Sequence, residues 1–267
     1  MSEAGMSDEA RHKARVREQF GTTAQDYVSS TYHRSGRDLD LVVDLIEATP
    51  DAIALDIATG GGHTALAVAP HVKQVIATDL TPTMLAAAKT FITSQGVTNA
   101  TFEVAEAERL PFDDSAFDIV TCRVAPHHFS DVHAFAREVT RVLKPGGRFL
   151  LIDTFAPDDD ELDAFFNEVE ARRDPTHVRD YRIKEWHGWL RDLGLQIDVV
   201  EQFDKRHEFE SWTARSRMIA ADKDALEQRI LTAPARVREY FDVVEDDGKL
   251  ISFADQKFLM RARKPGV

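Results

Sequence analysis

The stretch Ile53-Ala-Leu-Asp-Ile-Ala-Thr-Gly-Gly-Gly-His-Thr64 decides the fold of this chain. A strand is predicted over Ile53 to Ile57, and it runs into three consecutive glycines and then into a short helical stretch, Thr64 to Ala69. Glycine lets a backbone turn tightly and bring its amides against a ligand. A glycine-rich turn between strand and helix is typical of nucleotide-like ligand sites in α/β proteins. Asp56 adds a carboxylate at the end of the strand, just before the turn.

Composition and charge exclude several classes of protein. The chain has 267 residues, of which 43% are hydrophobic, and this is enough for one large domain with a sizeable core. The formal net charge of −13 argues against a nucleic-acid-binding surface, which would be basic. No apolar run approaches the ~20 residues of a membrane span, and the charged first residues lack the apolar segment of a signal peptide. Cys122 is the single cysteine, which excludes an internal disulfide and favours a cytoplasmic location.

Strands and helices alternate from Ile53 onward. The next strands are predicted near 75–78, 101–104, 117–124 and 148–155. One helix follows Thr81-Pro82, and another is predicted to begin at a Ser130 cap and to end near Leu143. This alternation is typical of a parallel sheet with helices on both faces, in which ligands bind at the carboxyl ends of the strands.

The alternation weakens after Phe155. Helices are predicted over 158–173, 182–193 and 211–240, the last broken at Pro234, together with strands over 196–203 and 256–263. We find no repeat or linker, so we expect one α/β domain with inserted helices.

Two cofactor classes fit the spacing of the glycine turn. Gly60-x-Gly62-x-x-Ala65 satisfies the dinucleotide pattern G-x-G-x-x-G/A, with Asp79 at the end of the second strand, so a nicotinamide-dependent oxidoreductase stays open. The positions before that pattern are normally apolar, whereas here they read Asp56-Ile-Ala-Thr59. The pattern acidic-x-Gly-x-Gly-x-Gly fits with Ala58 in place of the first glycine. That pattern suits S-adenosylmethionine, which carries an ammonium, a sulfonium and a ribose diol but no phosphate.

Acidic residues after the second and third strands agree with S-adenosylmethionine. Asp79 is placed to accept hydrogen bonds from both ribose hydroxyls, and Leu80 to pack on the adenine. Glu106 and Glu108 follow the third strand, where a carboxylate meets an adenine amino group. Their spacing does not decide which of the two faces the cofactor.

Four segments together resemble the class I S-adenosylmethionine-dependent methyltransferases, in the branch of the ubiquinone/menaquinone C-methyltransferases. They are LDIATGGGHTA (55–65), VIATDLTPTML (75–85), AEAERLPFDDSAFDIVTCR (105–123) and REVTRVLKPGGRFLLID (137–153). The resemblance implies a Rossmann-like sheet of seven strands in the order 3-2-1-4-5-7-6, with strand 7 antiparallel near Gln256 to Arg263. Two departures are Ala58 at the first glycine position and Glu106 where aspartate is commoner.

The resemblance also implies a division of the chain and a set of cofactor contacts. Residues 1–50 would form a helical lid, 51–155 the cofactor half and 156–267 the acceptor side of a domain over 51–267. Within the lid-like segment 16–36, Tyr27 and His33 are expected to close over S-adenosylmethionine. The expected cofactor contacts are Tyr27, His33, Asp56, Ala58, Thr59, Gly60, Gly62, Asp79, Leu80, Met84, Glu106, Ala107, Glu108 and Arg123. For Arg123, a structural ion pair with a carboxylate is the alternative.

His127 and His128 come just after the fourth strand, beside the expected methyl group. With an ordinary pKa near ~6.5, either is a candidate general base, and the alternative is that both only shape the pocket. The run continues to Asp131 and His133, but a helix beginning at Ser130 would keep them from converging, so we expect no metal.

The sequence therefore predicts a cytoplasmic S-adenosylmethionine-dependent methyltransferase. Its partner would be a small-molecule acceptor such as a quinol, a phenol-like compound or another apolar metabolite. A base is needed only if the acceptor is a hydroxyl or a carbon acid. A nicotinamide-dependent oxidoreductase and a non-catalytic S-adenosylmethionine-binding protein are the alternatives. Residues 155–250 carry no motif that names the acceptor, and nothing in the sequence predicts an oligomeric state.

Overall fold

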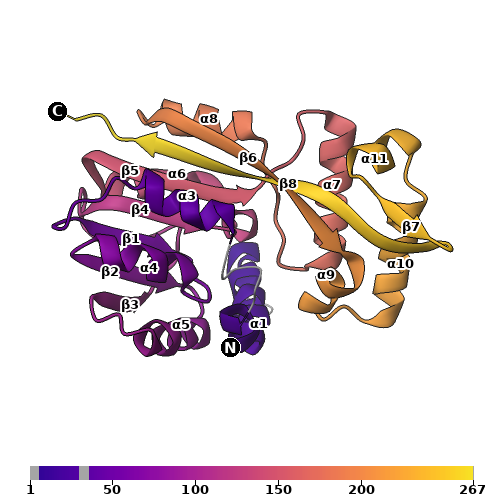
Figure 1. Cartoon of the computed structure of the whole chain (residues 1–267), viewed down its shortest axis with the longest axis horizontal. Coiled ribbons are helices and arrows are strands. Elements are labelled where there is room, and N and C mark those ends of the chain that lie inside the picture. The colour runs from indigo at the N-terminus through magenta and orange to yellow at the C-terminus, as the bar shows by residue number, and fades with distance from the viewer. Residues whose placement is uncertain (1–5, 30–35, 267) are drawn as a thin grey trace.

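A mixed β-sheet forms the centre of the computed structural model, which describes residues 6–29 and 36–266 (Figure 1). In these residues the sheet has the path β3-β2-β1-β4-β5-β8-β6, and a short eighth strand, β7, pairs with β8. The first five strands pair in parallel, and β8 is antiparallel to both β5 and β6. The strands are β1 (Ile53–Ile57), β2 (Gln74–Asp79), β3 (Ala100–Val104), β4 (Phe117–Arg123), β5 (Leu143–Thr154), β6 (Gln196–Glu208), β7 (Val244–Asp246) and β8 (Lys249–Arg263).

This topology confirms the predicted order and the antiparallel last strand, with β8 as the expected strand 7. The count of seven was one too few, because β7 is only three residues long and wholly exposed. It lacks the alternation of buried and exposed residues that reveals a strand in a sequence.

Helices cover both faces of the sheet, as predicted. On one face, α3 (Arg37–Leu45), α4 (His63–Val68) and α5 (Pro82–Ser94) pack around Val75, Ala77 and Leu150. On the other, α6 (Val132–Val142) and α8 (Ile183–Asp192) pack around Leu55, Val120 and Leu151. Both cores consist of side chains that are essentially inaccessible to solvent.

Beyond the sheet, β6 and β8 extend into a helical lobe. Both strands are longer than predicted, and Figure 1 shows them crossing from the sheet to the lobe. The lobe has its own apolar core, which is built by α7 (Asp160–Arg173), α9 (Phe209–Arg215), α10 (Ala220–Leu231) and α11 (Ala235–Tyr240). The single helix predicted over 211–234 was wrong, because Arg217 adopts a φ of 53° and ends α9 before α10 begins.

The N-terminal helix α1 (Asp8–Ser29) lies between the sheet and the lobe (Figure 1). It packs on α5 through Ala24, Met84 and Ala87. Its C-terminal part touches the glycine turn so closely that a Cβ on Gly61 would stand 2.8 Å from the carbonyl oxygen of Tyr27. Only glycine fits at this position, so the turn and α1 are matched to each other.

The start of α6 corrects one local prediction. Asp131, and not Ser130, is the N-cap, and its carboxylate accepts a hydrogen bond from the Ala134 amide at 2.8 Å. The Ser130 hydroxyl instead donates to Glu108 at 2.8 Å. In the part of the chain that the structure describes, no helix combines the length and the hydrophobicity that crossing a membrane requires.

Candidate active site

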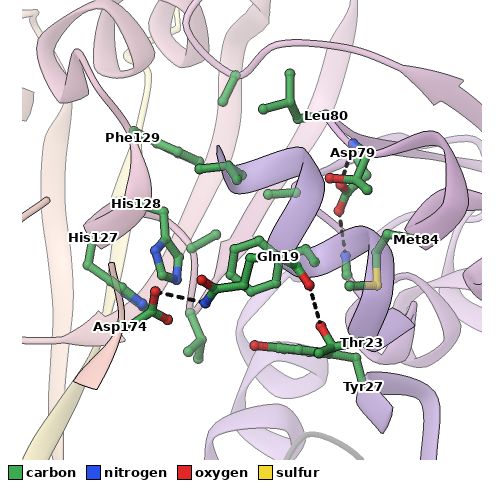
Figure 2. Close-up of a pocket in the computed structure, with 18 of the residues that line it drawn as sticks. Gln19, Thr23, Tyr27, Asp79, Leu80, Met84, His127, His128, Phe129 and Asp174 are labelled. Carbon is green, nitrogen blue, oxygen red and sulfur yellow. Dashed lines mark hydrogen bonds between the residues drawn. The ribbon is translucent and has the colours of Figure 1, made fainter. Parts of the chain in front are cut away.

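A cavity opens at the carboxyl ends of the parallel strands, bounded by α1 on one side and by the helical lobe on the other. Figure 2 shows Asp79, Leu80 and Met84 at one end, His127, His128 and Asp174 at the other, and Gln19, Thr23 and Tyr27 of α1 between them. Of the predicted site residues, the cavity is lined by Tyr27, Ala58, Gly60, Asp79, Leu80, Met84, Glu106, Ala107, Glu108, His127 and His128. His33 lies outside the described residues.

The backbone of the glycine turn is hydrogen-bonded within the protein. The amide of Thr59 donates to the Thr78 carbonyl at 2.7 Å, and the amide of Gly62 donates to the Thr59 carbonyl at 2.9 Å. The amide of Gly60 donates to the carboxylate of Asp79 at 3.1 Å. A dinucleotide site needs such amides for the pyrophosphate. These three amides are engaged within the protein, which disfavours a nicotinamide dinucleotide at this turn.

Asp56, Thr59 and Gly62 do not line the cavity. The carboxylate of Asp56 is buried, and it accepts hydrogen bonds from the hydroxyls of Thr59 and Thr121, each at 2.6 Å. Burial raises the pKa of Asp56 to about 6, and the two hydroxyls oppose this rise. These three residues therefore shape the turn from outside the cavity wall.

Asp79 faces the cavity at the end of β2. One carboxylate oxygen accepts the Gly60 amide and the other accepts the Thr81 amide at 2.8 Å. Burial raises the pKa of Asp79, and these backbone donors oppose the rise. The Thr81 side chain and the Leu80 amide also act as hydrogen-bond donors to this carboxylate. The walls beside it, Leu80 and Met84, are apolar (Figure 2).

Lys13 of α1 joins the two glutamates that follow β3. Its ammonium lies 3.2 Å from Glu106 and 3.3 Å from Glu108, and it also donates to Glu9 at 2.6 Å. Burial opposes this charge, but the carboxylates outweigh the burial and raise the pKa of Lys13. Glu108 also accepts the amide and hydroxyl of Ser130, so its carboxylate is committed to holding this loop.

Arg123 requires a correction. Its Nε donates to the carboxylate of Asp38 on α3 at 2.9 Å, and Lys257 lies 3.4 Å from the same oxygen. Arg123 is absent from the cavity lining. The side chain therefore takes part in a buried ion cluster between β4, α3 and β8, which favours the alternative of a structural ion pair over a cofactor contact.

His127 and His128 occupy the turn η3 (Pro126–His128) directly after β4, and their ring centroids are 4.1 Å apart. His127 Nδ1 lies 2.6 Å from a carboxylate oxygen of Asp153 at the end of β5. Burial lowers the pKa of His127, but the Asp153 charge outweighs it and raises the pKa to about 9. Burial and the neighbouring His127 charge lower the pKa of His128 to about 3.

Sequence reasoning missed Asp153. It stands at the carboxyl end of the predicted strand 148–155, which lies beside the strand that leads to His127. In parallel sheets, the carboxyl ends of neighbouring strands share one edge. This rule would have allowed the sequence to place Asp153 close to His127.

A metal site receives little support from the hydrogen bonds. Among the described residues, only His127, Asp153 and Asp180 bring at least three ligand-type atoms within 4.8 Å of one another. Asp153 already accepts hydrogen bonds from His127 Nδ1, from the His127 amide and from the Thr154 amide. Asp131 caps α6, and the His133 ring lies against Trp189, so neither joins this group.

The far end of the cavity, beyond the histidines, is polar. Its residues come from β5, the lobe and the extended halves of β6 and β8, in a region that carried no motif. They include Thr154, Glu170, Arg173, Asp174, Asp180, Lys205, His207, Arg215, Ser216 and Asp255. Two tryptophans of this region, Trp186 and Trp212, lie in the hydrophobic cores and do not line the cavity.

Comparison with known proteins agrees with this geometry. A methyltransferase-domain family model matches residues 55–151. YcgJ of Bacillus subtilis, an uncharacterized methyltransferase, is 37% identical over 92% of this chain and 97% of its own length. A ubiquinone/menaquinone biosynthesis C-methyltransferase of Shewanella frigidimarina is 34% identical over 43% of this chain and 47% of its own length.

A solved structure shows the same relationship in three dimensions. A candidate methyltransferase from Bacillus halodurans superposes with a TM-score of 0.85 at 39% identity, and covers 86% of this chain and 100% of that one. Together with the glycine turn and the acidic cavity, these matches establish the family. The chain belongs to the class I S-adenosylmethionine-dependent methyltransferases.

Proposed function

We propose that this enzyme methylates a small hydroxylated molecule that binds in the polar end of the cavity. The observation that carries the proposal is the continuity of one cavity, from Gly60 and Asp79 past His127 to the lobe residues Glu170 and Arg173. One cavity that joins these two ends lets a methyl donor at one end meet an acceptor at the other.

The donor end matches the chemistry of S-adenosylmethionine. Asp79 presents an acidic hydrogen-bond acceptor to the cavity for the ribose hydroxyls, and Leu80 and Met84 offer apolar surface for the adenine. Glu106 is a better partner for the adenine amino group than Glu108, which already binds Ser130. When bound, S-adenosylmethionine supplies an electrophilic methyl group. The protein then has to orient the acceptor and exclude water.

Tyr27 on α1 supports the predicted role of this helix as a lid. Its ring lines the cavity, and it packs edge-to-face on Phe20 with centroids 5.6 Å apart. Gln19 of the same helix donates to Asp174 at 2.8 Å, on the acceptor side (Figure 2). Because α3 packs on the sheet, we propose that the lid expected over 1–50 consists of α1 alone and that α3 belongs with the domain over 51–267.

The polar lining of the acceptor end favours some classes of acceptor over others. Quinols, phenol-like compounds and other apolar metabolites were the expected acceptors, but the far end carries buried acids and bases, including Glu170 and Asp255. Burying an apolar chain against such groups is unfavourable, because their hydrogen bonds with water are lost without replacement. We therefore favour a compact acceptor with several polar groups, phenolic or aliphatic, over a quinol with a long apolar chain. A cytoplasmic location stays a prediction.

A methyl-transfer screen tests this function. The full chain would be incubated with S-adenosylmethionine labelled in the methyl group and a panel of phenols, hydroxy acids, quinols, amines and thiols, with labelled product and S-adenosylhomocysteine both measured. We expect product with a compact hydroxylated compound, and much less of it with the Asp79→Asn variant when S-adenosylmethionine is supplied near the Kd of the wild type. Transfer to amines or thiols alone would contradict the proposed acceptor class. Absence of any product, while S-adenosylhomocysteine binds, would instead favour a non-catalytic binding protein.

A further inference from the structure

We propose that Asp153 is a positioning residue that holds His127 as the proton acceptor of the reaction. The inference rests on the proposed function, since a hydroxyl acceptor is one that has a proton to lose. It assigns the base to one histidine of the pair and gives a role to a carboxylate that does not itself reach the cavity.

The fold brings the two side chains together from neighbouring strands. β4 and β5 pair in parallel up to Arg123 and Ile152, so the residues after these positions meet at one edge of the sheet. Asp153 is the penultimate residue of β5, and His127 lies in the turn that follows β4. Amides of Val178 and Arg179 donate to the His127 carbonyl at 2.8 Å and 3.2 Å and hold the turn from the other side.

Hydrogen bonding defines the tautomer of His127. The carboxylate of Asp153 accepts the His127 amide at 3.1 Å and lies 2.6 Å from Nδ1. An ionised carboxylate only accepts hydrogen bonds, so Nδ1 carries a proton in the neutral ring and Nε2 carries the lone pair. His127 lines the cavity and Asp153 does not. The carboxylate therefore holds the ring from behind and leaves Nε2 for the acceptor, which is the arrangement of an oriented general base.

His128 lacks this arrangement. Its Nδ1 lies 3.0 Å from the Thr176 carbonyl oxygen, which can only accept, so its Nδ1 also carries a proton. Among the described residues, this ring meets the carbonyl and the hydroxyl of Thr176 and no carboxylate at hydrogen-bonding distance, and its pKa is low. A neutral ring of low basicity suits a wall of the acceptor site better than a base.

The proton transfer balances without any further reagent. The acceptor hydroxyl loses its proton to Nε2 of His127 as its oxygen bonds to the methyl carbon. The bond between that carbon and the sulfonium sulfur breaks, and the sulfur keeps the electron pair as a neutral thioether. The positive charge thus moves from sulfur to the imidazolium, where Asp153 stabilises it.

Charged and titratable groups face His127 from several elements: Asp153 on β5, Asp180 after α7, Glu170 on α7, and the rings of His128 and His177. Burial raises the pKa of Asp180 to about 8, so this carboxyl is largely neutral at pH 7. The acidic groups favour a protonated His127, whose pKa is about 9. The free enzyme must lose this proton before it can act as a base, so we expect kcat/KM to rise as pH approaches about 9.

The test is an NMR titration of ¹⁵N-labelled histidine in the full chain with S-adenosylhomocysteine bound. It requires no knowledge of the acceptor, so its failure is distinguishable from failure of the methyl-transfer screen. In the wild type we expect His127 to titrate with a pKa well above 6.5. We expect its neutral form, present at higher pH, to carry the proton on Nδ1. In Asp153→Asn the pKa should fall to 6.5 or below. Asp131→Asn, an exposed cap outside the cavity, should leave it unchanged.

Three results would overturn the proposal. One is a pKa of His127 that Asp153→Asn leaves unchanged. Another is a neutral His127 ring that carries its proton on Nε2, a result that the wild type alone can give. The third is selective broadening of the His127 signals by micromolar Mn²⁺, because Asp153 would then be a metal ligand. Once an acceptor is known, Asp153→Asn should also lose the rise of kcat/KM toward high pH while binding S-adenosylhomocysteine within about threefold of wild type, a difference below ~1 kcal/mol.

Discussion

The carboxylate of Asp79 accepts the backbone amide of Gly60 at 3.1 Å, so the turn after β1 and the acid after β2 form one unit. The two residues are 19 positions apart, and they meet because β1, which leads into the turn, pairs with β2, which ends at Asp79. This hydrogen bond takes an amide that a dinucleotide site would offer to a phosphate. It also aims a carboxylate at the cavity, which is what a ribose diol requires.

Replacing Asp79 by Asn should weaken S-adenosylhomocysteine binding. Hydrogen bonds to a charged group contribute about 1.5–3 kcal/mol, so the Kd should rise about tenfold to a hundredfold. Calorimetric titration measures this change. Asp113→Asn, in an exposed loop, is the control and should bind like the wild type. An unchanged Kd in Asp79→Asn would remove Asp79 from the cofactor site.

Replacing Asp56 by Asn should change how the free energy of unfolding depends on pH, but it should hardly change the affinity for the cofactor. The pKa of Asp56 is about 6 in the fold, against ~3.9 in an unfolded chain. The native state therefore binds the proton more tightly, and Asp56 costs the wild type stability as pH rises from about 4 to about 6. Over this pH window, the free energy of unfolding of the wild type should fall by on the order of 1–3 kcal/mol relative to that of Asp56→Asn.

Urea unfolding of both proteins at several pH values measures the difference for Asp56. The Kd for S-adenosylhomocysteine should change by less than about threefold, since Asp56 does not line the cavity. A larger loss of affinity, with stability retained, would place Asp56 in direct contact with the cofactor.

Replacing Asp38 by Asn should destabilise the protein through Arg123 and Lys257. Burial opposes the charge of Asp38, but the two cations outweigh it and lower its pKa. Removing one partner of a buried ion pair costs about 3–5 kcal/mol, because the other charge stays buried. Urea unfolding at pH 7 measures the loss. Asp40→Asn, exposed on the same helix, should change stability by less than about 0.5 kcal/mol; equal effects of the two substitutions would refute the ion cluster.

Replacing Lys13 by Met should loosen α1. The substitution keeps most of the apolar stem but leaves Glu106 and Glu108 without their shared cation. We expect amide hydrogens in the first half of α1 to exchange about tenfold faster, which corresponds to ~1.4 kcal/mol. Mass spectrometry of deuterium uptake measures this, with Arg15→Met on the exposed face as the control. Equal uptake in the two variants would mean that Lys13 does not hold the lid.

The sequence predicted the sheet and the donor end of the cavity, because both depend on local signals. The glycine turn and Asp79 stand directly after apolar strands, and strand ends mark the ligand edge of a parallel sheet. Arg123 was misplaced for the same reason: its position after β4 suggested the cavity, but a carboxylate on α3 draws its side chain elsewhere.

The acceptor end depends on contacts between distant residues. Asp153 meets His127 from 26 positions away, and Asp255 reaches His207 from 48 positions away. No local pattern brings such pairs together, since each depends on the pairing of strands. The polar character of this end therefore became visible only in three dimensions.

The central claim is that this cavity holds S-adenosylmethionine at Asp79 and the glycine turn. Thermal unfolding of the full chain with S-adenosylhomocysteine, and separately with NADH, tests it most directly. At a ligand concentration about 100 times the Kd, specific binding stabilises the native state by about 2.7 kcal/mol. We predict a rise in Tm with S-adenosylhomocysteine that Asp79→Asn strongly reduces, and no rise with NADH. A rise with NADH alone would contradict the account.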